Sequence, residues 1–175
     1  MSNGKCHLEI NEKETNDAVK DVFYKFVILH AATDDKEAER IKNMFQDEFD
    51  IKPGFIFAEM AAGQSILKTL EHAINGSAWT IILLTENFLS EAWCEFQFHA
   101  TLTNSLNLHH KYNSVIPVRP RTNYLPREKT PIPLRIFNAL EENNSAFEHQ
   151  VRKTFQESMY QKQHAIWKAE KVNSG

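Results

Sequence analysis

The segment AWTIILLT, residues 78–85, decides the fold class of this chain. It is an apolar run without a charged residue, which is typical of a strand buried on both faces of a parallel sheet. Asn75-Gly76 before it is a turn signal, and the aromatic-rich segment at residues 86–106 that follows it is predicted to be helical from about Ser90. A buried strand that continues into a helix indicates an α/β protein.

The chain before this strand repeats the alternation of strand and helix. FYKFVILHA, residues 23–31, becomes continuously apolar from Phe26 and predicts a first strand, and residues 33–49 carry apolar side chains at helical spacing. A Pro-Gly turn leads to a second short strand at Phe55–Phe57, and another amphipathic helix is predicted over residues 65–75.

The chain after the central strand completes the pattern. NSVIPVRP, residues 113–120, predicts a fourth strand that a proline ends, and the prolines of residues 120–135 predict an irregular connection. Residues 146–168 predict one long terminal helix. Because strands and helices alternate with short links, we expect right-handed crossovers and a flavodoxin-like three-layer α/β sandwich, a parallel sheet with helices on both faces.

The composition fits one domain with short tails. Of 175 residues, 42% are hydrophobic and 25% are charged, as in ordinary globular proteins. Residues 1–21 are polar, so we expect a flexible arm there, a single domain over residues 22–168 and a disordered tail over residues 169–175. The two cysteines fit a reducing compartment better than a disulfide framework.

Charge and targeting signals limit the partners of the chain. A net charge of −3 and a pI near 6.2 provide no basic field for nucleic acid. The sequence contains no apolar run of about 18 residues and no apolar leader, so a cytoplasmic location is expected. Residue 2 is serine rather than the glycine that N-myristoylation requires. Membrane attachment is therefore expected only through a lipid anchor that the chain as written does not contain.

The residues after the second strand lack the chemistry of a phosphate loop. Gly63 stands alone there, and Gln64 follows it instead of Lys-Ser or Lys-Thr. A phospho-acceptor domain would need an aspartate after the third strand, but Thr85 and Glu86 stand there. It would also need a lysine near the end of the fourth strand, which ends PVRP without one. No cofactor is predicted.

Metal-ligating and nucleophilic residues do not form a recognisable pattern either. Cys6-His7 lies in the polar arm, and His109-His110 are adjacent and would point apart on a regular element. Cys94 with His99 as its base is disfavoured, because a cysteine in an apolar helix pattern is more often a packing residue. No metal ligands and no catalytic residues are predicted.

Two motifs carry a resemblance to a known family. FYKFVILHAATDD, residues 23–35, is similar to the first sequence box of Toll/interleukin-1 receptor (TIR) domains, and TIILLTENFLSEAWCEFQF, residues 80–98, is similar to a later one. In the second motif the residues at the family's spacing are Asn87, Phe88, Ser90, Trp93 and Cys94. The resemblance covers about residues 22–168.

The resemblance implies a signalling function. A TIR domain of this kind would be a cytosolic adaptor that bridges TIR domains of a lipopolysaccharide-sensing Toll-like receptor to the downstream adaptor TRIF. Its output would be interferon and inflammatory signalling in innate immunity. The resemblance also implies self-association as a homo-oligomer, and recruitment to the plasma or endosomal membrane.

The alternative within the same family is an enzyme that hydrolyses NAD. The catalytic glutamate of such TIR domains falls at Gln97 in this chain. An amide cannot act as the carboxylate that accepts a proton or stabilises positive charge, so the enzyme is disfavoured.

The loop after the second strand is the predicted protein-interaction site. Its small and weakly charged residues, with Met60 as one adaptable apolar side chain, suit docking on a flat partner surface. Ala62 stands where the family commonly has proline. The alternative is that the loop has no binding role and only connects the second strand to the next helix. The predicted contact residues are Ala58, Glu59, Met60, Ala61, Ala62, Gly63 and Gln64.

A second set of residues is expected to be exposed at the same rim and to extend the contact. It contains Asp34, Asp35, Thr85, Glu86 and Asn87. For the two aspartates the alternative is a solvated helix start, in which Asp34 and Glu37 form a capping pair beside the helix dipole.

Overall fold

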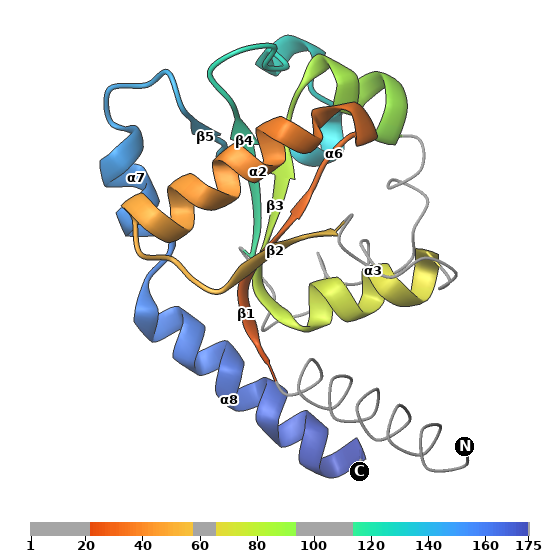
Figure 1. The fold of residues 1–175 in the computed structure, drawn as a ribbon, viewed down its shortest axis with the longest axis vertical. Helices are drawn as coiled ribbons and strands as arrows, with labels where there is room; N and C mark the ends of the chain where they lie inside the picture. Colours follow the sequence, from red (N-terminus) through yellow and green to blue (C-terminus); the bar gives the residue numbers. More distant parts are fainter. Residues whose placement is uncertain (1–21, 58–65, 94–113, 175) are drawn as a thin grey trace, which may run out of the picture.

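The sheet of this protein has five parallel strands in the order β2-β1-β3-β4-β5 (Figure 1). The strand order is that of flavodoxin-like folds, so the predicted fold class is confirmed. The computed structural model describes residues 22–57, 66–93 and 114–174. The strands are β1 (Tyr24–Leu29), β2 (Gly54–Ile56), β3 (Ser77–Leu83), β4 (Val115–Arg119) and β5 (Leu140–Glu141).

Helices follow the strands as the sequence predicts, with local irregularities. The predicted helix at residues 33–49 is one continuous element that begins as a 3-10 turn and ends as a π-helix. The elements are η1 (Ala32–Asp34), α2 (Asp35–Asn43), η2 (Met44–Glu48), α3 (Ile66–Asn75), η4 (Phe88–Ala92), η6 (Arg127–Lys129), α6 (Ile132–Arg135), α7 (Phe147–Thr154) and α8 (Glu157–Ser174).

Alternate side chains of β1 point into two separate cores. Phe26 and Ile28 pack in a cluster with α2, α7 and α8, whereas Val27 and Leu29 pack in a cluster with α3, η4 and α6. In Figure 1, α7 and α8 lie to the left of the sheet and α3 to its right. Because a strand alternates its side chains between faces, this continuous apolar run needs a helical layer on each side.

The C-terminal part of the chain differs from its prediction. The single long helix predicted over residues 146–168 is two helices, because the backbone at Phe155 leaves the helical region (φ −97°, ψ 66°). The centroid of the Phe155 ring lies 5.1 Å from the centroid of the Trp79 ring and 5.4 Å from that of the Phe45 ring. The tail expected to be disordered from residue 169 is helical through Ser174, and the two-residue strand β5 was not predicted.

Gly54 allows β2 to lie close to β1. Gly54 pairs with Phe26 in the sheet register, and a Cβ atom at Gly54 would lie 2.1 Å from Cζ of the Phe26 ring. Its N–H donates to Oε1 of Gln46 at 2.9 Å, which ties the strand to the end of the preceding helix. A side chain at this position would therefore displace a ring in the centre of the core.

We predict that Gly54→Ala destabilises the domain by about 1–3 kcal/mol, because the methyl group overpacks the core. Urea denaturation measures this change. In a double-mutant cycle, Phe26→Leu should recover part of the loss because it removes the clashing ring atoms. A Gly54→Ala variant as stable as the parent would contradict the close approach.

Candidate protein-interaction surface

The predicted contact loop leaves the sheet from its edge strand. β2 ends at Ile56, Phe57 packs partly buried against the core on the α3 side, and the described chain resumes at Ile66 in α3 (Figure 1). Residues 58–64, the predicted contact loop, lie between these anchors and outside the described residues. In open α/β sheets, binding sites form at the carboxyl ends of the strands, and this loop begins at such an end.

Asp34 is the centre of a hydrogen-bonded cluster at the same rim. The Thr85 hydroxyl donates to its Oδ2 at 2.5 Å, and Nδ2 of Asn87 donates to its Oδ1 at 2.9 Å. Thr85 Oγ1 also accepts the backbone N–H of Phe88 at 3.0 Å. The cluster therefore joins the segment after β1 to the segment after β3.

This cluster corrects two expectations from the sequence. Asp34 is 8% exposed and Thr85 is 1% exposed, although both were expected to face a partner. Asp34 makes no capping hydrogen bond, because its carboxylate is occupied by Thr85 and Asn87, and Glu37 instead accepts hydrogen bonds from Arg40.

The remaining members of the predicted second set do reach solvent. The side chain of Asp35 is 73% exposed, with Oδ1 3.8 Å from Nδ1 of His30. Glu86 is partly exposed and lies 3.5 Å from Nζ of Lys129. Asn87 is half-buried. Of the predicted second set, only Asp35, Glu86 and part of Asn87 therefore present polar groups to solvent at this rim.

A second network, which the sequence did not reveal, centres on the buried carboxylate of Glu142. Arg40 on α2 donates to both carboxylate oxygens of Glu142, at 2.8 and 2.6 Å, and the backbone N–H of Arg121 donates to the same carboxylate at 2.8 Å. Arg40 also pairs with Glu37. The partners Arg40 and Glu142 are 102 residues apart, so no local pattern signals the pair.

Burial of Glu142 and its hydrogen bonds act on its pKa in opposite directions. Desolvation alone would raise the pKa of this carboxyl, but the hydrogen bond and positive charge of Arg40, with help from Arg121, hold the pKa below its usual value. The same contacts raise the pKa of Arg40. Glu142 is therefore a buried anion at neutral pH, paired well enough to stay charged.

The described residues offer little to a metal ion or to a membrane span. Within residues 22–57, 66–93 and 114–174, no group of three or more His, Cys, Asp or Glu side chains is placed to hold a metal. In the same part of the chain, no helix has the length and apolar character needed to cross a bilayer. Cys94, His99 and the pair His109-His110 lie outside the described residues, as does Gln97.

The fold and this rim define a class of protein. The sequence profile of the TIR domain family matches residues 26–154, and the chain belongs to that family. Solved structures agree at the level of fold. The TIR-STING receptor of C. gigas superposes with a TM-score of 0.58 at 18% identity, covering 78% of this chain and 41% of that one. The TIR domain of the Toll-related receptor TRR-2 of Hydra magnipapillata gives 0.52 at 19% identity, covering 81% and 98%.

Within the family, the chain is similar to one particular adaptor. It is 57% identical to TIR domain-containing adapter molecule 2 (TRAM) of Homo sapiens, over 91% of this chain and 68% of that protein. The mouse protein of the same name is 54% identical over 83% and 63%. TIR domain-containing adapter molecule 1 (TRIF) of Bos taurus is 31% identical over 85% of this chain and 20% of its own length.

Substitution of the two aspartates at the rim should change stability by different amounts, because Asp34 is buried and Asp35 is exposed. We predict that Asp34→Ala costs about 1–3 kcal/mol of unfolding free energy, because two hydrogen bonds are lost and their donors are left in a buried site. Asp35→Ala, its exposed neighbour, should change stability by less than about 0.5 kcal/mol. Chemical denaturation compares them. Equal effects from the two variants would contradict the cluster described above.

Glu142 should make the unfolding free energy of the domain depend on pH in the acidic range. Because its pKa is lowered in the folded protein, the pair with Arg40 stabilises the fold above the usual carboxyl pKa of 4.5, and this contribution is lost as pH falls through the lower folded value. We predict that Glu142→Gln costs about 1–3 kcal/mol at pH 7, because it removes the charge-assisted hydrogen bonds from Arg40 and leaves Arg40 only Glu37 as an ionic partner. The difference from the parent should shrink below about pH 4.

The matched control for that experiment is Glu148→Gln. Glu148 forms an exposed ion pair with Arg152 on α7, and such pairs contribute about 0–1 kcal/mol. Urea midpoints for the parent and both variants between pH 7 and pH 3 measure the effect. A constant gap between Glu142→Gln and the parent across this range would show that the carboxylate charge does not matter.

Proposed function

We propose that this chain is a signalling adaptor that acts in innate immunity by binding other TIR domains. Its partners are the TIR domains of a lipopolysaccharide-sensing Toll-like receptor and of the downstream adaptor TRIF, and its output is interferon and inflammatory signalling. The similarity to TRAM over nine-tenths of the chain carries this proposal. The weaker similarity to TRIF is consistent with contacts between related domains.

The proposed contact is the loop Ala58–Gln64 at the carboxyl end of β2. Its residues have little charge or bulk, and Met60 supplies one flexible apolar side chain. Glu59 within the loop, and Asp35 and Glu86 as exposed anions at the same rim, would orient a partner more than they would tighten its binding. The buried carboxylate of Asp34 is occupied by Thr85 and Asn87 and is not itself offered to the partner.

The proposed adaptor does not hydrolyse NAD. The glutamate used by TIR hydrolases is replaced by Gln97, which has no carboxylate. At the described part of the rim, the Asp34 carboxylate is already occupied by two donors and is buried, so it is not available as a substitute base. Two relatives that are 57% and 56% identical to this chain are named as adapter molecules.

The proposed contacts are individually weak. A surface of one small loop falls at the low end of interface sizes, so stable signalling would need several contacts acting together. We place the protein in the cytoplasm and propose that it is recruited to the plasma or endosomal membrane with its receptor, where local concentration would strengthen such contacts.

The test is binding of the purified domain to receptor and TRIF TIR domains. Met60→Asp should weaken both interactions by about ten-fold or more, because a buried apolar contact becomes a desolvated charge. Met159→Asp is the matched control, since Met159 is an exposed methionine on α8, away from the rim. Surface plasmon resonance with the immobilised partner domains measures the change.

Equal binding by Met60→Asp and the parent would remove the loop from the contact. Loss of binding in Met159→Asp alone would move the contact to α8. Sustained consumption of NAD by the pure domain, abolished in Gln97→Ala, would contradict the non-catalytic part of the proposal.

A further inference from the structure

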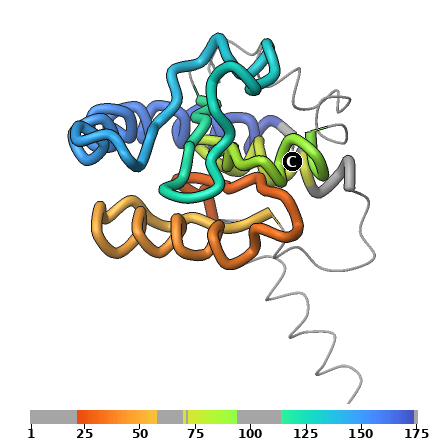
Figure 2. The backbone as a smooth tube through the Cα atoms, turned by 90° about the horizontal axis from the view of Figure 1, so that it is seen from above, coloured from red at the N-terminus to blue at the C-terminus, as the bar shows by residue number. Residues whose placement is uncertain are grey.

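The end of helix α8 projects beyond the body of the molecule. The first half of the helix is attached, since the Tyr160 hydroxyl donates to the Phe23 backbone oxygen at 2.9 Å and Gln163 donates from Nε2 to that of Ala78 at 2.8 Å. Residues 168–173, by contrast, are all exposed. Figure 1 shows this end of α8 below the sheet, and Figure 2 shows the blue segments as a layer apart from α2 (orange). Because short helical stretches are marginal in water without packing, this end points to a segment that covers it.

One side of the projecting part is apolar. Ala165, Ala169 and Val172 are exposed, Val172 at 79%, and Ile166 beside them is partly exposed. At about 100° per residue, these four side chains fall within roughly 120° around the helix, and Tyr160 lies on the opposite side. We call these four residues the α8 face. It is turned away from the contacts that attach the helix to the body.

Positive charge exceeds negative charge around the α8 face. From residue 162 onward the helix carries Lys162, Lys168 and Lys171 against Glu170 alone. Lys162 lies one turn before Ile166 and Lys168 one turn before Val172, so both cations are neighbours of the face. In the described part of the chain, neither of these two lysines forms an ion pair. A segment that covers the face should therefore combine small apolar side chains with acids.

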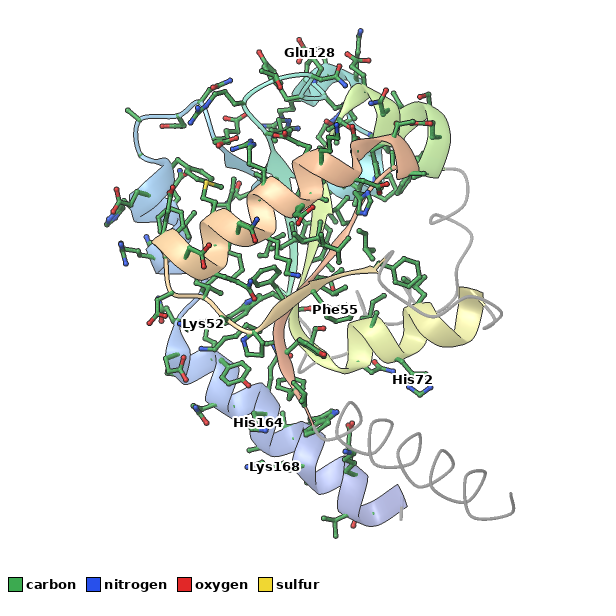
Figure 3. All side chains as sticks on the ribbon, in the orientation of Figure 1. Lys52, Phe55, His72, Glu128, His164 and Lys168 are labelled. Atoms are coloured by element: carbon green, nitrogen blue, oxygen red, sulfur yellow. The ribbon has the colours of Figure 1, made fainter. Side chains whose placement is uncertain are left out.

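The first residues of the domain lie directly against α8. The centroid of the Phe23 ring lies 5.6 Å from that of Tyr160, 5.3 Å from that of His164 and 5.2 Å from that of Trp167. Figure 3 shows His164 beside the start of β1. Residues 1–21, which lie outside the described residues, therefore join the domain next to the projecting part of α8. A segment of that length spans about 30 Å as a helix and more when extended, enough to reach the whole α8 face.

The sequence before Phe23 has the composition that the α8 face requires. Thr15, Ala18, Val19 and the exposed Val22 follow the i, i+3, i+4, i+7 spacing of one helical side. Acids outnumber lysines in residues 8–21, which contain Glu9, Glu12, Glu14, Asp17 and Asp21 against Lys13 and Lys20.

A second copy of the α8 face would be a poorer occupant than this segment. If two such faces packed together, Lys162 and Lys168 would approach their own copies, and like charges brought together are unfavourable. The segment before Phe23 is also tethered beside the face. Its effective concentration there is about millimolar whatever the concentration of the protein, so a weak contact is sufficient.

We propose that residues 8–21 pack along α8 of the same molecule, with Ala18 and Val19 on the α8 face and the acids beside Lys162 and Lys168. These residues are ordered in this arrangement, whereas composition alone favours a flexible arm. The contact goes beyond the adaptor function proposed above, since it lies at the amino ends of the strands and involves no partner domain. It withholds the exposed side of α8 from other proteins.

Hydrogen exchange of the full chain, followed by mass spectrometry of its peptides, tests the contact from both sides. In the parent, the amides of residues 8–21 should exchange about ten-fold or more slowly than unprotected amides. Val172→Asp should remove this protection, because a charge replaces an apolar contact. In the reciprocal experiment, Val19→Asp should speed exchange in residues 168–174. High salt should also speed exchange in residues 8–21, because it screens the charges.

Each variant has a matched control. Ile132→Asp places the same charge on an aliphatic side chain that is 71% exposed on α6, away from α8. Asn16→Asp adds the same charge to the segment outside its apolar spacing. Both controls should keep the protection of residues 8–21. Val172 and Ile132 are exposed, so circular dichroism should show an unchanged fold in both variants.

Residues 8–21 that exchange at unprotected rates in the parent would overturn the proposal. Protection that survives Val172→Asp would overturn it as well, since the segment would then pack elsewhere. Protection that appears only at high protein concentration would assign the α8 face to a second copy. Protection that appears only when a receptor TIR domain is added would assign the segment to that partner, and either result would contradict a contact within one molecule.

Discussion

The parallel pairing of β1 with β3 at the centre of the sheet is the interaction on which the rest of this structure depends. Phe26 lies beside Trp79 and Ile28 beside Ile81, and both strands are buried along most of their length. Since their side chains alternate between two cores, helices must cover both faces. The same pairing brings the ends of the two strands together, where Asp34 and Thr85 meet across the rim. The sheet core and the rim are thus consequences of one contact.

Two hydrogen-bonded networks join separate segments at the rim where the contact loop begins. The Asp34 cluster joins the segments after β1 and β3, and Arg40 joins α2 to the segment after β5 through Glu142. Asp34, Thr85 and Glu142 are buried and use their polar groups internally. These groups are therefore not available to a partner at this rim, and the weakly charged loop remains the proposed contact.

Sequence reasoning succeeded where the signal is local and failed where it depends on distant partners. The buried strands are visible as apolar runs, so the sheet and its class could be predicted. The break at Phe155 could not, because the helical spacing continues through it and only the pocket between Phe45 and Trp79 explains the turn. Asp34 looked like an exposed helix start, since its partners Thr85 and Asn87 are about 50 residues away in sequence.

The measurement that tests the account most directly is a nuclear magnetic resonance titration of the labelled domain with the unlabelled TIR domain of its receptor. The account predicts that the largest amide shift changes fall between residues 57 and 66, with smaller changes at Asp35 and Glu86. It also predicts little change at the buried Asp34 and Thr85. Shift changes centred on α8, with the loop unaffected, would contradict the claim that this rim binds the partner.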